Sequence, residues 1–460
     1  MTNVPPSPPK LLIISHDTVG QYMAGPGIRY YHIARELARY VDTTLAIPAE
    51  SPAAAPEHAF PLVRYTRGDW ATLAPHVQRA TILLFPSDTA NEFPALATSN
   101  AYLIVDGYDP LMAEWLALSG HIVPTESMAA WNQRLIQLAR QYMVGDLFIC
   151  ASERQRDWWL GLLEANGRIN PATFQADPSL RNLIDVVPYG LSASLPQPTR
   201  PVIKGVWPGI QTTDKVLLWG GGLWPWLDPL TAIRAVAKIR ETRPDVKLIF
   251  PGTKHPNPRM DGMPTQNAAA MQLAESLGLR DQGVFFGDWV AYADWANVLL
   301  ESDVALTLHY ATLETRLAFR SRVLEYIWAG LPVVATRGDA TSELLTHYQL
   351  GLEVADGDVD GVAQAIQQLL DQPPALYQAR VEAARHALTW ERAVAPLIAF
   401  CQAPWHAADK PSVGKLEHPL YSQLRNERDY WQKLAEGYAH GRVMRVMLWL
   451  QQLLRSRASA

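Results

Sequence analysis

The sequence predicts an α/β fold of two doubly wound lobes followed by a helical tail. Short apolar runs alternate with helical patterns along most of the chain, as in parallel sheets joined by crossover helices. A stretch rich in Pro, Ser, Thr and Gly at residues 192–213 interrupts this alternation, which then starts again. The length of 460 residues suggests two or three domains at about 150 residues each. The predicted units are residues 1–197, 198–405 and 406–460.

The first half opens with a strand, a glycine-bearing loop, a helix and a second strand, predicted at residues 10–15, 20–27, 28–40 and 45–47. Apolar side chains recur on one face of that helix, as in an amphipathic helix. Four more strands are predicted, each followed by a polar or glycine-containing turn, at residues 81–85, 102–105, 147–150 and 184–187. The sequence Gly25-Pro-Gly27 is not a full dinucleotide fingerprint, so NAD binding is not favoured.

Aspartates follow the ends of two of these strands. Asp88 comes after one strand, and Asp106 and Asp109 come after the next. Carboxylates at the carboxyl ends of parallel strands are candidates for acceptor binding or acid–base catalysis, although turn capping also explains such residues. We therefore treat Asp106 as a candidate catalytic residue.

The second half repeats the alternating pattern from residue 215. Its strands are predicted at residues 215–219, 246–250, 284–286, 304–308 and 332–335. Asp228 or Thr231 caps a helix that runs to about residue 242, and a second helix covers residues 268–277. Residues 373–401 are also predicted to be helical.

Composition excludes several classes of protein. A net charge of −5 argues against general nucleic-acid binding, and a 48% hydrophobic content supports buried cores. Two cysteines, Cys150 and Cys401, make neither a disulfide framework nor a metal site, so a reducing cytoplasm is expected. Residues 1–9 lack the pattern of a signal peptide, and no apolar run is long enough to span a bilayer.

The tail is predicted to be helical over residues 421–456. Residues 443–454 are apolar and have arginines around them. Such a helix can lie on an anionic membrane surface, pack on the first lobe, or associate with a partner as a coiled coil. These three interpretations stay open.

The most informative stretch is the loop and helix between the last two predicted strands. The helix begins near Ser321 and ends at Gly330, where glycine suits a left-handed C-cap. A helix N-terminus at the carboxyl edge of a parallel sheet is a site for anions. Arg316, Arg320 and Arg322 add positive charge, which favours a phosphate or diphosphate.

Glu325 lies about one turn into this helix, where its carboxylate can accept from sugar hydroxyls. The bland alternative is a basic loop with a solvated glutamate. Glycines at 220–222 let the backbone approach a ligand, or make a plain tight turn. Tryptophans near presumed loops serve either core packing or sugar and base stacking: Trp219, Trp224, Trp226 and Trp289.

Several motifs then resemble glycosyltransferase family 4, the group 1 glycosyltransferases, over about residues 10–402. The motifs are WGGGL at 219–223, DPLTAIRA at 228–235, GTKHP at 252–256, FFGDWV at 285–290, RVLEYIWAGLPVV at 322–334 and TWER at 389–392. The resemblance implies the GT-B fold of two Rossmann-like lobes. It also implies transfer of a sugar from a nucleotide diphosphate donor, with retention of configuration and without a metal or cofactor.

The resemblance assigns donor-binding roles to matching positions. Glu325 matches the second glutamate of the family's paired motif, which holds the donor ribose. Trp289 and Val290 match the turn against the nucleobase. The glycine loops match at Gly221 and Gly222 beside the diphosphate, and at Gly25 and Gly27 in the interlobe cleft.

This sequence departs from the family pattern at two places. The first glutamate of the pair would stand at Leu317, and Glu314 is the nearest substitute. The usual Arg and Lys that neutralise the diphosphate would stand at Gly222 and Leu227. We hypothesise that arginines of the other loop supply that charge together with a lysine, namely Arg320, Arg322 and Lys254. The predicted catalytic residues are Glu314, Arg320, Arg322 and Asp106.

The resemblance implies a cytoplasmic bacterial enzyme of polysaccharide or cell-envelope synthesis. Such an enzyme is either free in the cytoplasm or bound at the inner face of the membrane. Its partners would be a nucleotide sugar and a glycan or lipid-linked acceptor. The two departures leave two alternatives. One is a nucleotide-sugar epimerase of the same fold, and the other is a non-catalytic sugar-nucleotide-binding or assembly protein.

Overall fold

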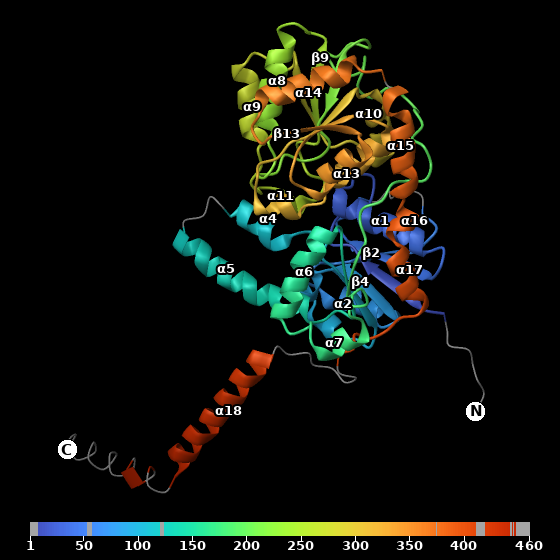
Figure 1. Ribbon diagram of the computed structural model, residues 1–460. Helices are drawn as coiled ribbons and strands as arrows, with labels where there is room; N and C mark the ends of the chain where they lie inside the picture. The colour runs from blue at the N-terminus through green and yellow to red at the C-terminus, as the bar shows by residue number, and fades with distance from the viewer. Residues whose placement is uncertain are drawn as a thin grey trace, which may run out of the picture.

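The structure is a computed structural model that describes residues 8–52, 58–119, 124–373, 375–410 and 419–441, with 444, 446 and 447. Two α/β lobes lie one above the other (Figure 1). Each lobe has one parallel sheet between helices, which confirms the predicted fold class. None of the described helices is long and apolar enough to cross a bilayer.

The first lobe is built on a seven-stranded sheet with the order β3-β2-β1-β4-β5-β6-β7. Its strands are β1 (Lys10–Ile14), β2 (Asp42–Pro48), β3 (Leu62–Tyr65), β4 (Ile82–Pro86), β5 (Tyr102–Asp106), β6 (Leu147–Cys150) and β7 (Ile184–Val186). Its helices are α1 (Gly25–Leu37), α2 (Trp70–Val77), α3 (Thr89–Glu92), α4 (Leu111–Leu118), α5 (Pro124–Leu138), α6 (Glu153–Ala165) and α7 (Pro171–Ala176), with 3-10 turns η1 (Pro94–Thr98) and η2 (Ala139–Tyr142).

The second lobe has six parallel strands in the order β10-β9-β8-β11-β12-β13. They are β8 (Lys215–Leu218), β9 (Val246–Pro251), β10 (Val284–Gly287), β11 (Val304–Thr307), β12 (Val333–Thr336) and β13 (Gly351–Val354). Its helices are α8 (Pro229–Arg240), α9 (Asn267–Ser276), α10 (Trp295–Glu301), α11 (Leu313–Leu317), α12 (Ser321–Ala329), α13 (Ala340–Tyr348), α14 (Val359–Asp371) and α15 (Ala375–Ala387), with 3-10 turns η3 (Pro258–Met260) and η4 (Tyr292–Asp294).

Every strand predicted from an apolar run is present, whereas the edge strands β3 and β13 were not predicted. In β3 only Tyr65 is buried, and in β13 only Val354 is buried. An edge strand is paired on one side only, so it needs less apolar side chain than a central strand. The predicted start of α1 is also three residues late, because Pro26 occupies the first turn of the helix.

The chain crosses back to the first lobe near its carboxyl end. After α15, the bridge between Leu191 and Thr389 joins the two segments, and α16 (Trp390–Ala393) and α17 (Ala395–Gln402) follow. The Trp390 ring stacks on His32 of α1 at 5.1 Å, and α17 lies beside the lower lobe in Figure 1. The boundary expected at residue 405 therefore falls after the chain has already returned to the first lobe.

Candidate functional site

A cavity of ≈ 410 Å³ lies between the two lobes. Loops that follow parallel strands of both sheets line it, including His16 after β1, Asp88 after β4, Gly221 after β8, His255 after β9 and Trp289 after β10. The carboxyl edges of the two sheets therefore meet at one crevice, which is where open α/β sheets bind ligands.

Helix α12 points its N-terminus into this cavity, and its sequence explains its limits. Gly330 adopts the left-handed conformation with φ of 75°, and its amide bonds back to the last turn. The first turn has no side-chain cap, and Ser321 and Arg322 line the cavity. The predicted limits of this helix are confirmed.

A second helix N-terminus faces the first across the crevice. Helix α1 of the first lobe also starts without a side-chain cap, at Gly25. A Cβ atom placed on Gly25 would lie 3.1 Å from the Ser321 hydroxyl. Two sets of free amide groups and two positive helix ends therefore converge on one place, which favours an anion there.

Arg322 is the cation best placed for that anion. Its side chain lines the cavity, and its Nη1 is buried without a hydrogen-bond partner in the described structure. Burial lowers the pKa of Arg322, and the nearby Arg320 charge acts in the same direction. Because an unpaired buried cation is costly, a bound anion here would recover that free energy.

Arg320 lines the same cavity but already has acidic partners. Its two terminal nitrogens donate to the Glu314 carboxylate at 2.8 and 2.7 Å, and Asp339 lies 3.6 Å from its Nε. Glu314 and Asp339 are nearly fully buried. The Glu314 carboxylate is occupied by Arg320, so it holds the loop before α12 in place. The positive charge expected from Arg320 is largely neutralised.

Glu325 stands one turn further along α12. Its carboxylate accepts from the indole Nε1 of Trp295 at 2.9 Å. Burial raises the pKa of Glu325 to about 7, while the Trp295 hydrogen bond and the Arg322 charge oppose that rise. A group with this pKa changes charge near neutral pH.

Glu325 and Trp295 also border a second cavity of ≈ 710 Å³. Its wall includes several aromatic residues. Trp328 and Trp390 belong to motifs quoted from the sequence, whereas the sequence did not single out His32, Tyr189 or Tyr292. The hydroxyl of Tyr189 is buried without a hydrogen-bond partner in the described structure. Glu325 therefore stands where two neighbouring cavities meet.

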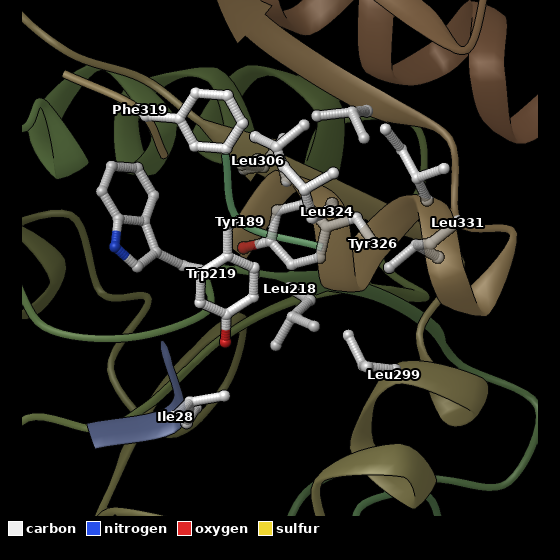
Figure 2. Packing of buried hydrophobic residues seen from close by; sticks show 14 of the residues in the cluster. Ile28, Tyr189, Leu218, Trp219, Leu299, Leu306, Phe319, Leu324, Tyr326 and Leu331 are labelled. Atoms are coloured by element: carbon white, nitrogen blue, oxygen red, sulfur yellow. The ribbon is translucent and has the colours of Figure 1, made fainter. Parts of the chain in front are cut away.

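Buried side chains of the core contact the glycine loop after β8 and fix its position. The Gly220 amide donates to the Tyr326 hydroxyl at 2.8 Å. Figure 2 shows Tyr326 packed beside Trp219, with Ile28 and Tyr189 of the first lobe near the same cluster. Gly221 has a positive φ of 91° and approaches Arg322, while Gly222 also lines the cavity. Both predicted glycines are thus at the cavity wall.

The tryptophans divide between the two expected roles. Trp219 is fully buried core. Trp224 and Trp226 stack on each other at 5.6 Å and line the first cavity. Trp289 and Val290 also line it, and the Trp289 indole donates to the Met23 carbonyl of the first lobe at 3.0 Å. Trp289 therefore joins the lobes as well as forming the cavity wall.

The first lobe contributes an acidic end to the cavity. His16 lies 3.8 Å from Asp88 and 3.7 Å from Asp109. Burial raises the pKa of Asp109 to about 6, although His16 opposes the rise. Burial and neighbouring carboxylates also raise the pKa of Glu114 well above its usual value. The sequence pattern gave no signal for Glu114, while His16 directly follows the first strand.

Four expectations about site residues need correction. Asp106 does not face the cavity, because its buried carboxylate is paired with Arg29 at 2.7 and 3.1 Å. Lys254 and Arg316 are exposed and do not line the cavity. Gly27 lies behind the wall, where an added Cβ would be 2.2 Å from the Thr18 carbonyl oxygen.

The packing of the chain explains why Asp106 and Lys254 do not line the cavity as predicted. Arg29 comes from α1, far from Asp106 in sequence, and the pair forms only when the helix packs on the sheet. Lys254 sits in the loop after β9, and that loop turns His255 toward the cavity instead. Among the described residues, no group of three or more His, Cys, Asp or Glu side chains could hold a metal. The expectation that no metal is needed stays a prediction.

The geometry defines a two-lobed α/β protein with a cavity between its lobes. Residues 214–372 match the family described as "Glycosyl transferases group 1". This match confirms the resemblance found in the sequence over the second lobe. No curated protein matches the sequence.

Solved structures share the fold at low sequence identity. Sucrose-phosphate synthase from Thermosynechococcus elongatus is 15% identical, with a TM-score of 0.58 over 91% of this chain and 100% of that chain. WaaG, a glycosyltransferase of lipopolysaccharide biosynthesis, is 18% identical, with a TM-score of 0.58 over 86% and 100%. Anabaena HepE, solved with UDP and glucose, is 16% identical, with a TM-score of 0.57 over 85% and 99%.

Proposed function

We propose that the protein transfers a sugar from a nucleotide diphosphate sugar to an acceptor held by the first lobe, with retention and without a metal. The observation that carries this proposal is the place of Arg322 in the first turn of α12, where two helix N-termini without side-chain caps line one cavity together with Glu325. That arrangement fits a diphosphate next to a ribose. The family match over the second lobe supports the same donor class.

The donor would span both cavities. Its diphosphate lies against Gly221, Arg322 and the helix N-termini, and its ribose hydroxyls bond to the Glu325 carboxylate. The base enters the aromatic second cavity, beside the residues that follow Val290. The sugar then extends toward His255 and the acidic end formed by the first lobe.

In the transfer step, a bond forms between the acceptor oxygen and the anomeric carbon while the bond to the diphosphate oxygen breaks. The acceptor hydroxyl gives its proton to the leaving phosphate on the same face of the sugar, which preserves configuration. Negative charge grows on the diphosphate as the bond breaks. Arg322 and the helix ends stabilise that charge, and this is the largest catalytic contribution expected here.

Binding of the donor can be measured first. HepE was solved with UDP, so UDP-sugars are the first probes, followed by GDP-, dTDP- and ADP-sugars. A donor at a hundred-fold excess over its Kd raises the free energy of unfolding by about 2.7 kcal/mol. A thermal-shift series should therefore identify the base of the donor. If no nucleotide sugar raises the unfolding temperature, the proposal is ruled out.

Turnover then separates transfer from the alternatives. Transfer requires an acceptor, so loss of donor should accelerate when a candidate acceptor is added. An epimerase converts its donor with no acceptor present, and a binding protein does neither. Nuclear magnetic resonance of the product reports the anomeric configuration, and an inverted product would contradict the proposed retention.

A further inference from the structure

Arg134 is a further cation at the cavity, and the proposed donor does not use it. It belongs to α5 of the first lobe and lines the first cavity. Its Nε is buried without a hydrogen-bond partner, and no carboxylate among the described residues forms an ion pair with it. Arg322 and Arg134 therefore approach one cavity from opposite lobes, each with an unsatisfied nitrogen.

Arg320 also has a buried Nε without a hydrogen-bond partner, but it is paired with Glu314 and lies 3.6 Å from Asp339. Arg322 and Arg134 have no such ion pair among the described residues, so they favour two separate anions. Arg322 lies at the glycine loop of the second lobe, where the donor diphosphate is placed. Leu111 and Leu118 of α4 line the same cavity as Arg134, so part of its wall is apolar. The Arg134 side chain is half-buried, and a guanidinium in such surroundings favours a phosphate-type ligand that it can contact with more than one nitrogen.

The same helix exposes several large apolar side chains among polar ones. Met128, Leu135 and Ile136 of α5 are 57%, 45% and 74% exposed, and Leu116 of α4 is 47% exposed. The rings of Trp115 and Trp131 pack at 5.3 Å and hold α4 against α5. In Figure 1, α5 projects from the first lobe away from the sheet. Apolar side chains of this size on an exposed helix indicate a binding surface.

We propose that the acceptor is a lipid phosphate, with its phosphate bound by Arg134 and its hydrocarbon chain lying along the exposed face of α4 and α5. This inference rests on the proposed function, because it names the acceptor of that transfer. A single amphiphile explains both features, since one end needs a cation and the other needs an apolar surface.

The acidic side chains nearby do not cancel the charge of Arg134. Asp88 and Asp109 face His16 at 3.8 and 3.7 Å. Glu114 lies in a buried position that disfavours its charged form. These groups are placed to contact the hydroxyl of the acceptor, while Arg134 holds its phosphate.

Binding of simple probes tests this without knowledge of the natural acceptor. The probes are dodecyl phosphate below its micelle concentration, inorganic phosphate and dodecyl maltoside, measured by calorimetry on the full chain with UDP present. The wild type should bind dodecyl phosphate at least ten-fold more tightly than either other probe. R134Q should lose about ten-fold or more of that affinity.

Matched variants test the phosphate contact at Arg134 and the hydrocarbon contact on α4 and α5 separately. Arg140 is exposed and does not line the cavity, so R140Q should bind dodecyl phosphate like the wild type. A double variant with Met128→Ser and Ile136→Ser should weaken binding of dodecyl phosphate but leave inorganic phosphate unchanged. UDP affinity should be equal in R134Q and wild type, because Arg134 lies outside the donor site.

Three results would overturn the inference. R134Q could bind dodecyl phosphate as tightly as wild type, dodecyl maltoside could bind equally well, or inorganic phosphate could match dodecyl phosphate. Binding to phosphatidylglycerol vesicles that R134Q leaves intact would point to a membrane surface instead of a bound lipid. If the wild type fails to bind any nucleotide diphosphate, the proposed function fails independently of these outcomes.

Discussion

At the scale of single residues, two arginines only two positions apart have different roles. Both were predicted to neutralise the diphosphate, yet Arg320 is committed to Glu314 while Arg322 has a free nitrogen. A hydrogen bond from a charged group contributes about 1.5–3 kcal/mol, whereas breaking a buried ion pair costs about 3–5 kcal/mol. Substitution of Arg322 should therefore reduce donor affinity, whereas substitution of Arg320 should reduce the free energy of unfolding.

We expect Arg322→Gln to weaken binding of the nucleotide sugar by about ten- to a hundred-fold with little loss of thermal stability. The reason is that no ion pair of Arg322 is present among the described residues, so none is lost. Arg320→Gln should instead lower the unfolding temperature strongly, because it leaves Glu314 buried and unpaired. Calorimetric titration and thermal unfolding of both variants test this. Equal losses of donor affinity in two stable variants would contradict the division.

The pKa of Glu325 gives donor binding a pH dependence. The carboxylate accepts ribose hydroxyls best when ionised, and burial raises its pKa to about 7. Affinity for the nucleotide sugar should therefore fall by up to about ten-fold between about pH 8 and about pH 6. Glu325→Gln should bind more weakly at high pH and lose this dependence. A wild-type affinity that is flat across the range would argue against the ribose contact.

The same group also affects stability without donor. The native state keeps a proton on Glu325 between its usual pKa of 4.5 and about 7, where the unfolded chain has lost it. Fewer protons are bound by the unfolded state there, so this residue lowers stability as pH rises through that window. Glu325→Gln should reduce the fall in unfolding temperature over the window, as measured by differential scanning fluorimetry.

At the scale of elements, function depends on α1 and α12 meeting end to end. Gly25 and Ser321 sit at their first positions, and no room remains for a Cβ atom without a shift of a few tenths of an ångström. Closure of the crevice therefore depends on a glycine in one lobe and a short side chain in the other. The contact couples two helices that belong to different sheets.

Gly25→Ala should hold the two helix ends apart and lower kcat about ten-fold, because a small misplacement of reacting groups is costly. Adding Ser321→Gly should restore much of the lost rate by making room for the new methyl group. The comparison requires kcat and KM for the single and double variants. If the double variant is no faster than Gly25→Ala alone, the contact between these helices does not limit closure.

At the scale of the whole molecule, the two lobes are held together by contacts on both sides of the cavity. Asn257 donates to Asp17 at 2.7 Å, and Gln155 donates to the Leu317 carbonyl at 2.8 Å. Arg154 of α6 also pairs with Glu343 of α13. The returning chain adds a covalent connection, because α16 and α17 follow the second lobe in sequence but lie on the first.

The segment after α17 should be necessary for the first lobe. Asp409 pairs with the fully buried Arg168 at 2.7 Å, and Lys410 pairs with the fully buried Asp146 at 2.7 Å. A chain that ends after Pro404 should lose about 3–5 kcal/mol of stability, because these charges stay buried without partners.

A chain that ends after Lys410 is the control. It lacks α18 (Pro419–His440), which stands away from both lobes in Figure 1, so it should unfold at nearly the wild-type temperature. Chemical denaturation of both truncated chains gives the comparison. If the longer chain were destabilised as much as the shorter one, α18 would be part of the folded core. Most of the apolar stretch predicted at residues 443–454 lies outside the described residues, so membrane contact through it stays a prediction.

Local sequence by itself determined the α/β alternation, the central strands and the limits of α12, because burial period, helix caps and turn residues act over a few neighbours. It also placed Glu325 and the glycines of the β8 loop near the site. Only the tertiary structure decided which charges are free. Arg29 pairs with Asp106 and Arg320 pairs with Glu314, whereas Arg322 and Arg134 form no ion pair in the part of the chain that the structure describes. Ion pairs join residues that are distant in the chain, so their formation depends on how helices pack and not on spacing in the sequence.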